Sequence, residues 1–127
     1  MPYTGQPKLL ISEPDFELLR FDLEQGLAYV LLGDVDSGGA GRVLEAFQSE
    51  SGEGGKVEFL MEDAELIDGI SVTRMVEAVR CLLRNFDQVR LIYSPQMLAH
   101  SIYKVGMLKG GAGLELVDPR EEEGGAN

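Results

Sequence analysis

The sequence is poor in the side chains that build most chemical sites. Its 127 residues include one cysteine, one histidine and no tryptophan. A single thiol forms neither an intramolecular disulfide nor a thiolate metal cage. Cys81 stands beside Leu82 and Leu83, where a buried structural thiol is expected rather than a reactive one. Five Phe and four Tyr without Trp predict a largely aliphatic core.

Positive charge is also scarce. Eleven Lys and Arg residues face 22 Asp and Glu residues, which gives a formal net charge of −11 at pH 7. A surface this acidic repels nucleic-acid phosphates and anionic membranes, so neither is expected as a partner. A basic or neutral partner stays open, and plain solubility also explains the acidity.

Long apolar runs are absent. The longest, LAYVLL at residues 27–32, is far short of the ~20 residues needed to span a bilayer. The N-terminal sequence MPYTGQPKLLISEPDF lacks the basic region and long apolar run of a signal peptide. These absences predict a cytoplasmic protein without membrane insertion.

The apolar spacing predicts one α/β domain over residues 16–118. Residues 1–15, with three prolines, are expected to form a flexible lead-in, and residues 119–127, PREEEGGAN, a disordered acidic tail. The expected strands are 16–23, 27–32, 57–61, 89–93 and 114–117, and the expected helices start near residues 41, 72 and 95. An opening hairpin followed by alternating strands and helices predicts a mixed, largely parallel sheet of four to five strands with helices packed on it.

Two details of these elements follow from their composition. The run 27–32 is almost continuously apolar, which indicates a strand covered on both faces. Ser94 is expected to cap the last helix, with Pro95 at the first helical position.

The stretch GDVDSGGAGRVLE, residues 33–45, admits three interpretations. Four of its residues fit positions one, three, six and twelve of an EF-hand calcium loop, namely Asp34, Asp36, Gly39 and Glu45. However, the cation Arg42 stands at position nine, and a strand precedes the stretch where a helix is required. A phosphate loop is also unsupported, because neither GxxxxGK[ST] nor GxGxxG is present. The stretch therefore predicts a structural turn in which Asp36 or Ser37 caps the following helix.

No catalytic constellation is visible in the sequence. His100 lies on the last helix without the nearby nucleophile and carboxylate that would make it a general base. Glu62 and Asp63 are interpreted as a solvated loop at the end of a strand. The sequence therefore predicts a protein that is not an enzyme and that uses no metal and no cofactor.

Three segments, taken in order, resemble the STAS domain family. LLGDVDSGGAGRVLEAF resembles its L-x-G-E-L-D strand end and first helix, with Gly33 and Asp36 on the matching Gly and Asp. ELIDGISVTRMVEAVRCLL resembles the strand end and loop [FI]-[IL]-D-S-S-G-L before the second helix, matched by Ile67 and Asp68. VRLIYSPQMLAHSIYKVGML resembles the third strand, proline loop and helix. The likeness spans residues 16–117.

STAS domains are non-enzymatic. They occur in anti-sigma-factor antagonists, stressosome proteins, anion-transporter tails and regulatory subunits of lipid-transport ATPases. In the antagonists a kinase-like anti-sigma factor binds the D-S-S-G loop and phosphorylates its first serine, and the added negative charge breaks the interface. The resemblance implies a protein-interaction module of a bacterial partner-switching complex, with a kinase-like anti-sigma factor or an ATPase subunit as partner. The alternative is a structural or regulatory subunit of a larger assembly, and a homo-oligomer is also open.

The chain departs from the family at the phosphorylated position. Residues 68–72 are D-G-I-S-V where the family has D-S-S-G-L. Gly69 supplies no hydroxyl at the acceptor position, so binding is expected without the usual phospho-switch. Ser71 is either the helix N-cap or a displaced phospho-acceptor, and the cap is favoured. The expected partner-binding residues are Asp68, Gly69, Ile70, Ser71, Arg74 and Asp36.

Overall fold

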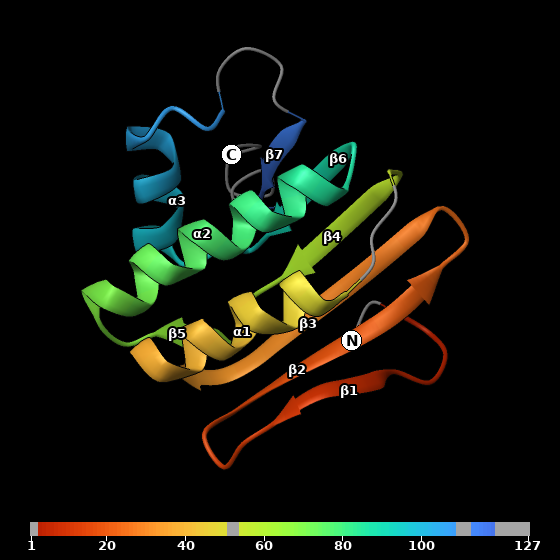
Figure 1. The fold of residues 1–127 in the computed structure, drawn as a ribbon, viewed down its shortest axis with the longest axis horizontal. Helices are drawn as coiled ribbons and strands as arrows, with labels where there is room; N and C mark the ends of the chain where they lie inside the picture. Colours follow the sequence, from red (N-terminus) through yellow and green to blue (C-terminus); the bar gives the residue numbers. More distant parts are fainter. Residues whose placement is uncertain (1–2, 51–53, 109–112, 119–127) are drawn as a thin grey trace, which may run out of the picture.

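The chain folds into a mixed sheet with helices packed on it (Figure 1). The computed structural model describes residues 3–50, 54–108 and 113–118. The strands are β1 (Lys8–Ser12), β2 (Phe16–Leu23), β3 (Gly26–Val35), β4 (Lys56–Leu60), β5 (Ala64–Leu66), β6 (Gln88–Ile92) and β7 (Leu114–Val117). The helices are α1 (Ser37–Ser49), α2 (Gly69–Asn85) and α3 (Gln96–Lys104).

The sheet combines an antiparallel start with a parallel remainder. Its strand order is β1-β2-β3-β4-β6-β7, and β5 pairs with the last residues of β3. β1, β2 and β3 are antiparallel neighbours, whereas β3, β4, β6 and β7 run parallel. The predicted α/β class, with a mixed and largely parallel sheet, is confirmed.

The number of strands was underestimated, because the described residues form a seven-stranded sheet rather than one of four to five strands. Residues 8–12 form β1 at the sheet edge, with a register shift between Leu9 and Ile11, so the flexible lead-in is wrong for that segment. β5 has three residues, too few for a periodic pattern, and forms because β3 extends beyond β4 and offers it a partner. The predicted tail at 119–127 lies outside the described residues.

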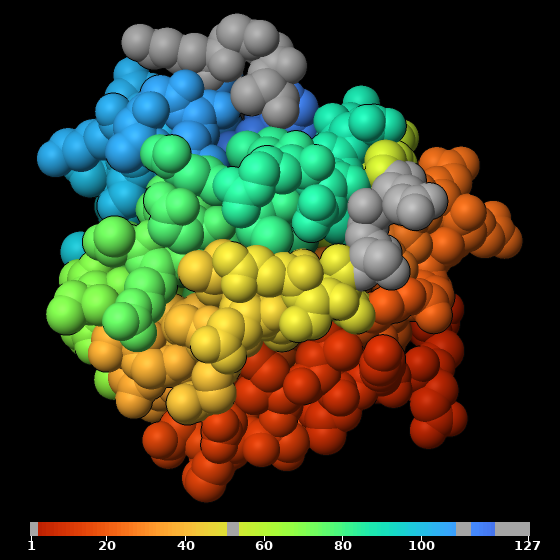
Figure 2. Space-filling view, in the orientation of Figure 1, coloured from red at the N-terminus to blue at the C-terminus, as the bar shows by residue number. Residues whose placement is uncertain are grey.

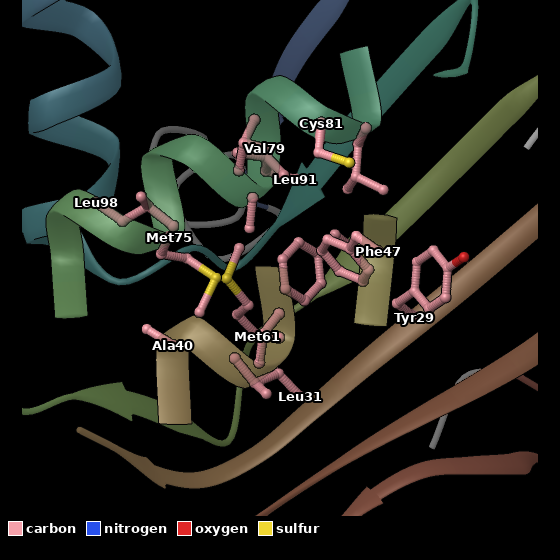
Figure 3. Packing of buried hydrophobic residues seen from close by; sticks show 14 of the residues in the cluster. Tyr29, Leu31, Ala40, Phe47, Met61, Met75, Val79, Cys81, Leu91 and Leu98 are labelled. Atoms are coloured by element: carbon pink, nitrogen blue, oxygen red, sulfur yellow. The ribbon is translucent and has the colours of Figure 1, made fainter. Parts of the chain in front are cut away.

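The helices lie on one face of the sheet, with α1 and α2 side by side across it (Figures 1 and 2). Beneath them Phe47 of α1 packs between Tyr29 and Phe59, with ring centroids 4.7 and 5.3 Å away (Figure 3). Cys81 is buried in the same cluster at 3% exposure, as its apolar neighbours predict. This cluster anchors α1 and α2 on the sheet.

The strand β3 is buried on both faces, as its continuous apolar run predicts. Tyr29 and Leu31 belong to the cluster under the helices. Ala28 and Val30 belong to a second cluster with Phe21 and Leu60 on the helix-free face. This second cluster is built from strand residues together with Tyr3 and Tyr93, and no helix residue belongs to it.

The C-terminal end of α1 is fastened to the β2–β3 hairpin by a polar contact. Glu50 Oε1 accepts hydrogen bonds from Arg20 Nη1 at 2.8 Å and from the Tyr29 hydroxyl at 3.2 Å. Burial, together with the Glu50 carboxylate, raises the pKa of Tyr29 above its ordinary value. Burial opposes the charged form of Arg20, but its hydrogen bonds to Glu50 and Asp22 more than offset this and raise its pKa.

The start of α3 differs from the expectation. Its N-cap is Pro95, which provides no side-chain hydrogen bond, so the prediction that Ser94 caps this helix is wrong. Tyr93 adopts a φ of 55°, and α3 begins at Gln96, one residue after the expected start. No helix in the described part of the chain is long and apolar enough to cross a membrane.

Candidate functional site

The glycine-rich stretch is a strand-to-helix turn. Asp36 is the N-cap of α1, and its Oδ1 accepts a hydrogen bond from the Gly39 backbone N–H at 2.7 Å. Because α1 begins at Ser37, Gly39 and Glu45 lie within the helix, and the twelve-residue loop of an EF-hand is not formed. The structural turn capped by Asp36 is confirmed.

Gly39 is required at this turn for a packing reason. It is buried, and a Cβ there would lie 2.9 Å from the Phe16 ring. At Gly33 the backbone has a φ of +99°, and a Cβ would clash with the Asp15 carbonyl. These glycines therefore serve the close approach of α1 and β3 to the start of β2.

The second strand-to-helix loop is closed by a capping box. Asp68 Oδ1 accepts a hydrogen bond from the Ser71 backbone N–H at 2.6 Å, and Ser71 Oγ accepts one from the Asp68 backbone N–H at 3.2 Å. Reciprocal bonds of this kind satisfy two of the free N–H groups at a helix start. Asp68 is therefore the N-cap of α2.

Ser71 occupies the third helical position rather than the N-cap, so its assignment as N-cap is wrong. Both residues of the pattern D-x-x-S, Asp68 and Ser71, take part in capping the helix. From the sequence, the N-cap was therefore assigned to the wrong one of the two. The Ser71 side chain is fully buried, and its hydroxyl also donates to the Asp68 carbonyl at 2.6 Å. A kinase reaches this hydroxyl only if the first turn of α2 unwinds, which argues against Ser71 as a displaced phospho-acceptor.

The two loops lie next to each other in the fold. β5 continues the parallel pairing with β3 up to Val35 and Leu66, and the Ile67 backbone N–H then donates to the Val35 carbonyl at 3.1 Å. Arg74 Nη1 donates to the Ser37 carbonyl at 2.7 Å, which ties α2 to the start of α1. In Figure 2 the first turn of α2 adjoins the start of α1 at the lower left.

The predicted partner-binding residues are therefore brought together, except that Ser71 is buried beneath them. Ile70 has 60% of its surface exposed, in the first turn of α2. Ile67 was not predicted as a partner-binding residue, although it is 57% exposed. The alternation of buried Ala64, exposed Glu65 and half-buried Leu66 places Ile67 on the outward side, but this alternation depends on β5, which the sequence did not predict.

The same two loops also carry exposed acidic side chains. The exposed residues in the two loops include Asp34, Asp36, Glu65 and Asp68, with Arg74 as the nearby cation. We call the set of Ile67, Ile70, Asp34, Asp36, Glu65, Asp68 and Arg74 the strand-end surface. It offers an apolar anchor within a negatively charged border.

Three other features of the described structure were considered as functional sites: a cavity, the single histidine and groups of metal-ligating side chains. A cavity of about 540 Å³ lies at the carboxyl ends of β4, β6 and β7, lined by residues that include Met61, Glu62, Tyr93 and Leu116. His100 is exposed on α3. No group of three or more His, Cys, Asp or Glu side chains suited to a metal ion occurs within the described residues.

Comparison with known proteins finds no family model and no curated protein that matches this chain. The function is therefore inferred from the strand-end surface and from the resemblance of its two loops to the STAS pattern.

Proposed function

We propose that this chain is a non-enzymatic protein-interaction module of the STAS type. It acts by binding a protein partner in a bacterial, cytoplasmic regulatory complex, such as a kinase-like anti-sigma factor or an ATPase subunit. The single observation that carries the proposal is the junction of the two loops that resemble the family. Residues 33–37 and 66–71 are distant in sequence but meet through β3 and β5.

The strand-end surface has the composition of a binding site rather than of a solvated turn. Single exposed apolar residues are common on proteins, but Ile67, in the loop after β5, and Ile70, in the first turn of α2, lie only three residues apart. The capping box holds the Asp68 and Ser71 backbone in place, so little conformational entropy is lost when a partner packs against Ile70.

The same geometry favours binding without phosphorylation. Gly69 lies at the family's acceptor position and has open space around it, since a Cβ there would meet no atom within 4 Å. An unmodified backbone at the tip of the loop lets a partner approach closely. The Arg74 guanidinium is held on the Ser37 carbonyl, so its charge is fixed at the border of the surface.

A capture experiment tests this function. The tagged chain, the Ile70→Asp variant and a Met97→Asp control are each incubated with a lysate of the source cells, and bound proteins are quantified by mass spectrometry. Met97 is 63% exposed on α3, so the control adds the same charge at a similarly exposed apolar residue. A partner that is retained by the wild type and by Met97→Asp but lost by Ile70→Asp supports the proposal. Equal retention by all three folded proteins rejects it.

The alternative function is a structural or regulatory subunit of a larger assembly, such as a stressosome-like scaffold or a lipid-transport ATPase complex. It is favoured by the exposed edge residue Leu9, which is 50% exposed and pairs with Leu19 of the helix-free cluster. The two functions differ in their response to modification, because a constitutive subunit stays bound whatever the phosphorylation state of its partner.

A further inference from the structure

A cavity opens at the carboxyl ends of three neighbouring parallel strands, β4, β6 and β7. β6 lies between the other two strands, so the residues that follow all three strands meet at one place. The cavity has a volume of about 540 Å³, within the range of about 300–1,000 Å³ that is typical of sites for small molecules. In open α/β sheets small molecules commonly bind outside the carboxyl ends of the strands, which is where this cavity lies.

Main-chain hydrogen bonds hold the walls of the cavity. Beyond β4, the Met61 backbone N–H donates to the Ile92 carbonyl at 3.0 Å, and the Ala64 N–H donates to the Met61 carbonyl at 3.1 Å, which closes a tight turn. Beyond β6, the Tyr93 N–H donates to the Val117 carbonyl at 2.9 Å. The cavity is therefore preformed, so little conformational entropy is lost when a ligand enters.

The connection between β6 and α3 shapes the middle of the cavity. Tyr93 has a φ of 55°, a conformation that is uncommon for a residue other than glycine. The N-cap of α3 is Pro95, which provides no side-chain acceptor for the first N–H groups of the helix. Ser94, Pro95 and Gln96 all line the cavity, so the N-terminus of α3, with its partial positive charge, adjoins it.

The other side chains of the cavity combine carboxylates with apolar surface. Glu62 follows β4 and Asp118 follows β7, so the two carboxylates lie on the two sides of the start of α3. Apolar surface comes from Met61, Ala64 and Leu116. No Lys, Arg or His is among the described residues that line the cavity.

These groups together determine which charges a ligand must carry. Two carboxylates without a cation repel phosphates and attract an ammonium group. The N-terminus of α3 favours a carboxylate, because its first N–H groups receive no acceptor from the N-cap side chain. A free α-amino acid carries an ammonium group and a carboxylate on one carbon atom. An aliphatic side chain on that atom suits the apolar surface of Met61 and Leu116.

We propose that this cavity binds a free α-amino acid with an aliphatic side chain. The ammonium group lies at Glu62 and Asp118, the carboxylate lies at the N-terminus of α3, and the side chain lies against Met61 and Leu116. Residues 67–70 lie outside the cavity lining, so amino-acid binding does not require the partner-binding role of the strand-end surface.

Calorimetry of the full chain with three probes of one branched carbon skeleton tests the proposal. L-Leucine carries both charged groups, isoamylamine lacks the carboxylate, and 4-methylpentanoate lacks the ammonium group. We expect one leucine to bind per chain, and each of the other two compounds to bind about tenfold more weakly or not at all. Because the chain has a net charge of −11, isoamylamine binding as tight as leucine binding would indicate a general attraction of cations and would overturn the proposal.

Matched variants separate the cavity from the general surface charge. Glu62→Gln should weaken leucine binding about tenfold. Glu65→Gln removes the same charge from β5, outside the cavity lining, and should leave binding unchanged. Both residues are exposed, so both variants are expected to fold, and circular dichroism checks this. If Glu62→Gln does not fold, Ala99→Leu replaces it, because the larger side chain would fill part of the cavity and should abolish binding.

Amide NMR shifts of the isotope-labelled chain locate the bound leucine. Leucine should shift the amide signals of Gln96 at the start of α3 and those of Glu62 and Val117, which line the cavity. Three further results overturn the proposal: no saturable binding of leucine, equal weakening by Glu62→Gln and Glu65→Gln, or shifts confined to residues outside the cavity.

Discussion

Replacing Asp68 by alanine removes the carboxylate that caps α2. In the structure this carboxylate accepts a hydrogen bond of 2.6 Å from the Ser71 backbone N–H, which lies in a buried part of the helix start. Loss of an N-cap side chain costs about 1 kcal/mol, and loss of a negative charge near the helix N-terminus adds roughly 0.5 kcal/mol. We therefore expect the free energy of unfolding to fall by about 1.5 kcal/mol and the melting temperature by roughly 5 °C.

Urea unfolding followed by circular dichroism measures this change, and an unchanged m-value shows that the unfolding transition is the same. Asp68→Asn keeps the acceptor oxygen and loses only the charge, so it should cost about 0.5 kcal/mol. Glu65→Ala, at an exposed neighbour on β5, serves as the control and should stay within about 0.5 kcal/mol of the wild type. An Asp68→Asn variant as unstable as Asp68→Ala would show that the hydrogen bond is not the source of the stability.

Three further predictions concern single features of the fold. Gly69→Ser adds a side chain in open space at a residue without positive φ, so urea unfolding should show equal stability or a gain of up to about 1 kcal/mol; a clear loss contradicts the geometry. Tyr29→Phe should cost about 1 kcal/mol at neutral pH through the lost bond to Glu50. Because the folded-state pKa of Tyr29 is raised above 10, its stabilisation is complete below pH 10 and is lost above it, so the difference from the wild type should shrink there; a growing difference is inconsistent with this. Calcium should leave the melting temperature unchanged, because the Asp36 carboxylate is engaged in capping α1. Tight, stoichiometric calcium binding in a calorimetric titration, with a rise in melting temperature, would refute this.

The sequence predicted the central strands and the helices because their apolar periodicity is long enough to be read. Leu27–Leu32 and the α2 face with Val72, Met75 and Val79 are of this kind. β1 and β5 were not predicted, because their own residues show no clear strand pattern. They are strands because they pair with β2 and β3, respectively. The predicted start of α3 was wrong by one residue. Nothing in the sequence around Tyr93 indicates that this residue has a left-handed backbone.

The candidate site was predictable in its residues but not in its assembly. Asp36 was identified as a helix cap from its sequence context, whereas the cap of α2 is Asp68 and not the favoured Ser71. The proximity of Asp36 and Asp68 depends on β5, which lies between them in the fold and was not predicted. The burial of Ser71 also depends on tertiary packing, since the residue faces the core one turn before Met75.

The affinity of the unmodified chain for its captured partner tests the proposed function most directly. Calorimetry compares the wild type, Ile70→Asp and Met97→Asp, all produced without phosphorylation. The proposed function predicts tight binding by the wild type and by Met97→Asp, and binding weaker by about 30-fold or more for Ile70→Asp, as for a central interface residue. Equal affinity of all three, or binding by the wild type only after phosphorylation, would contradict it.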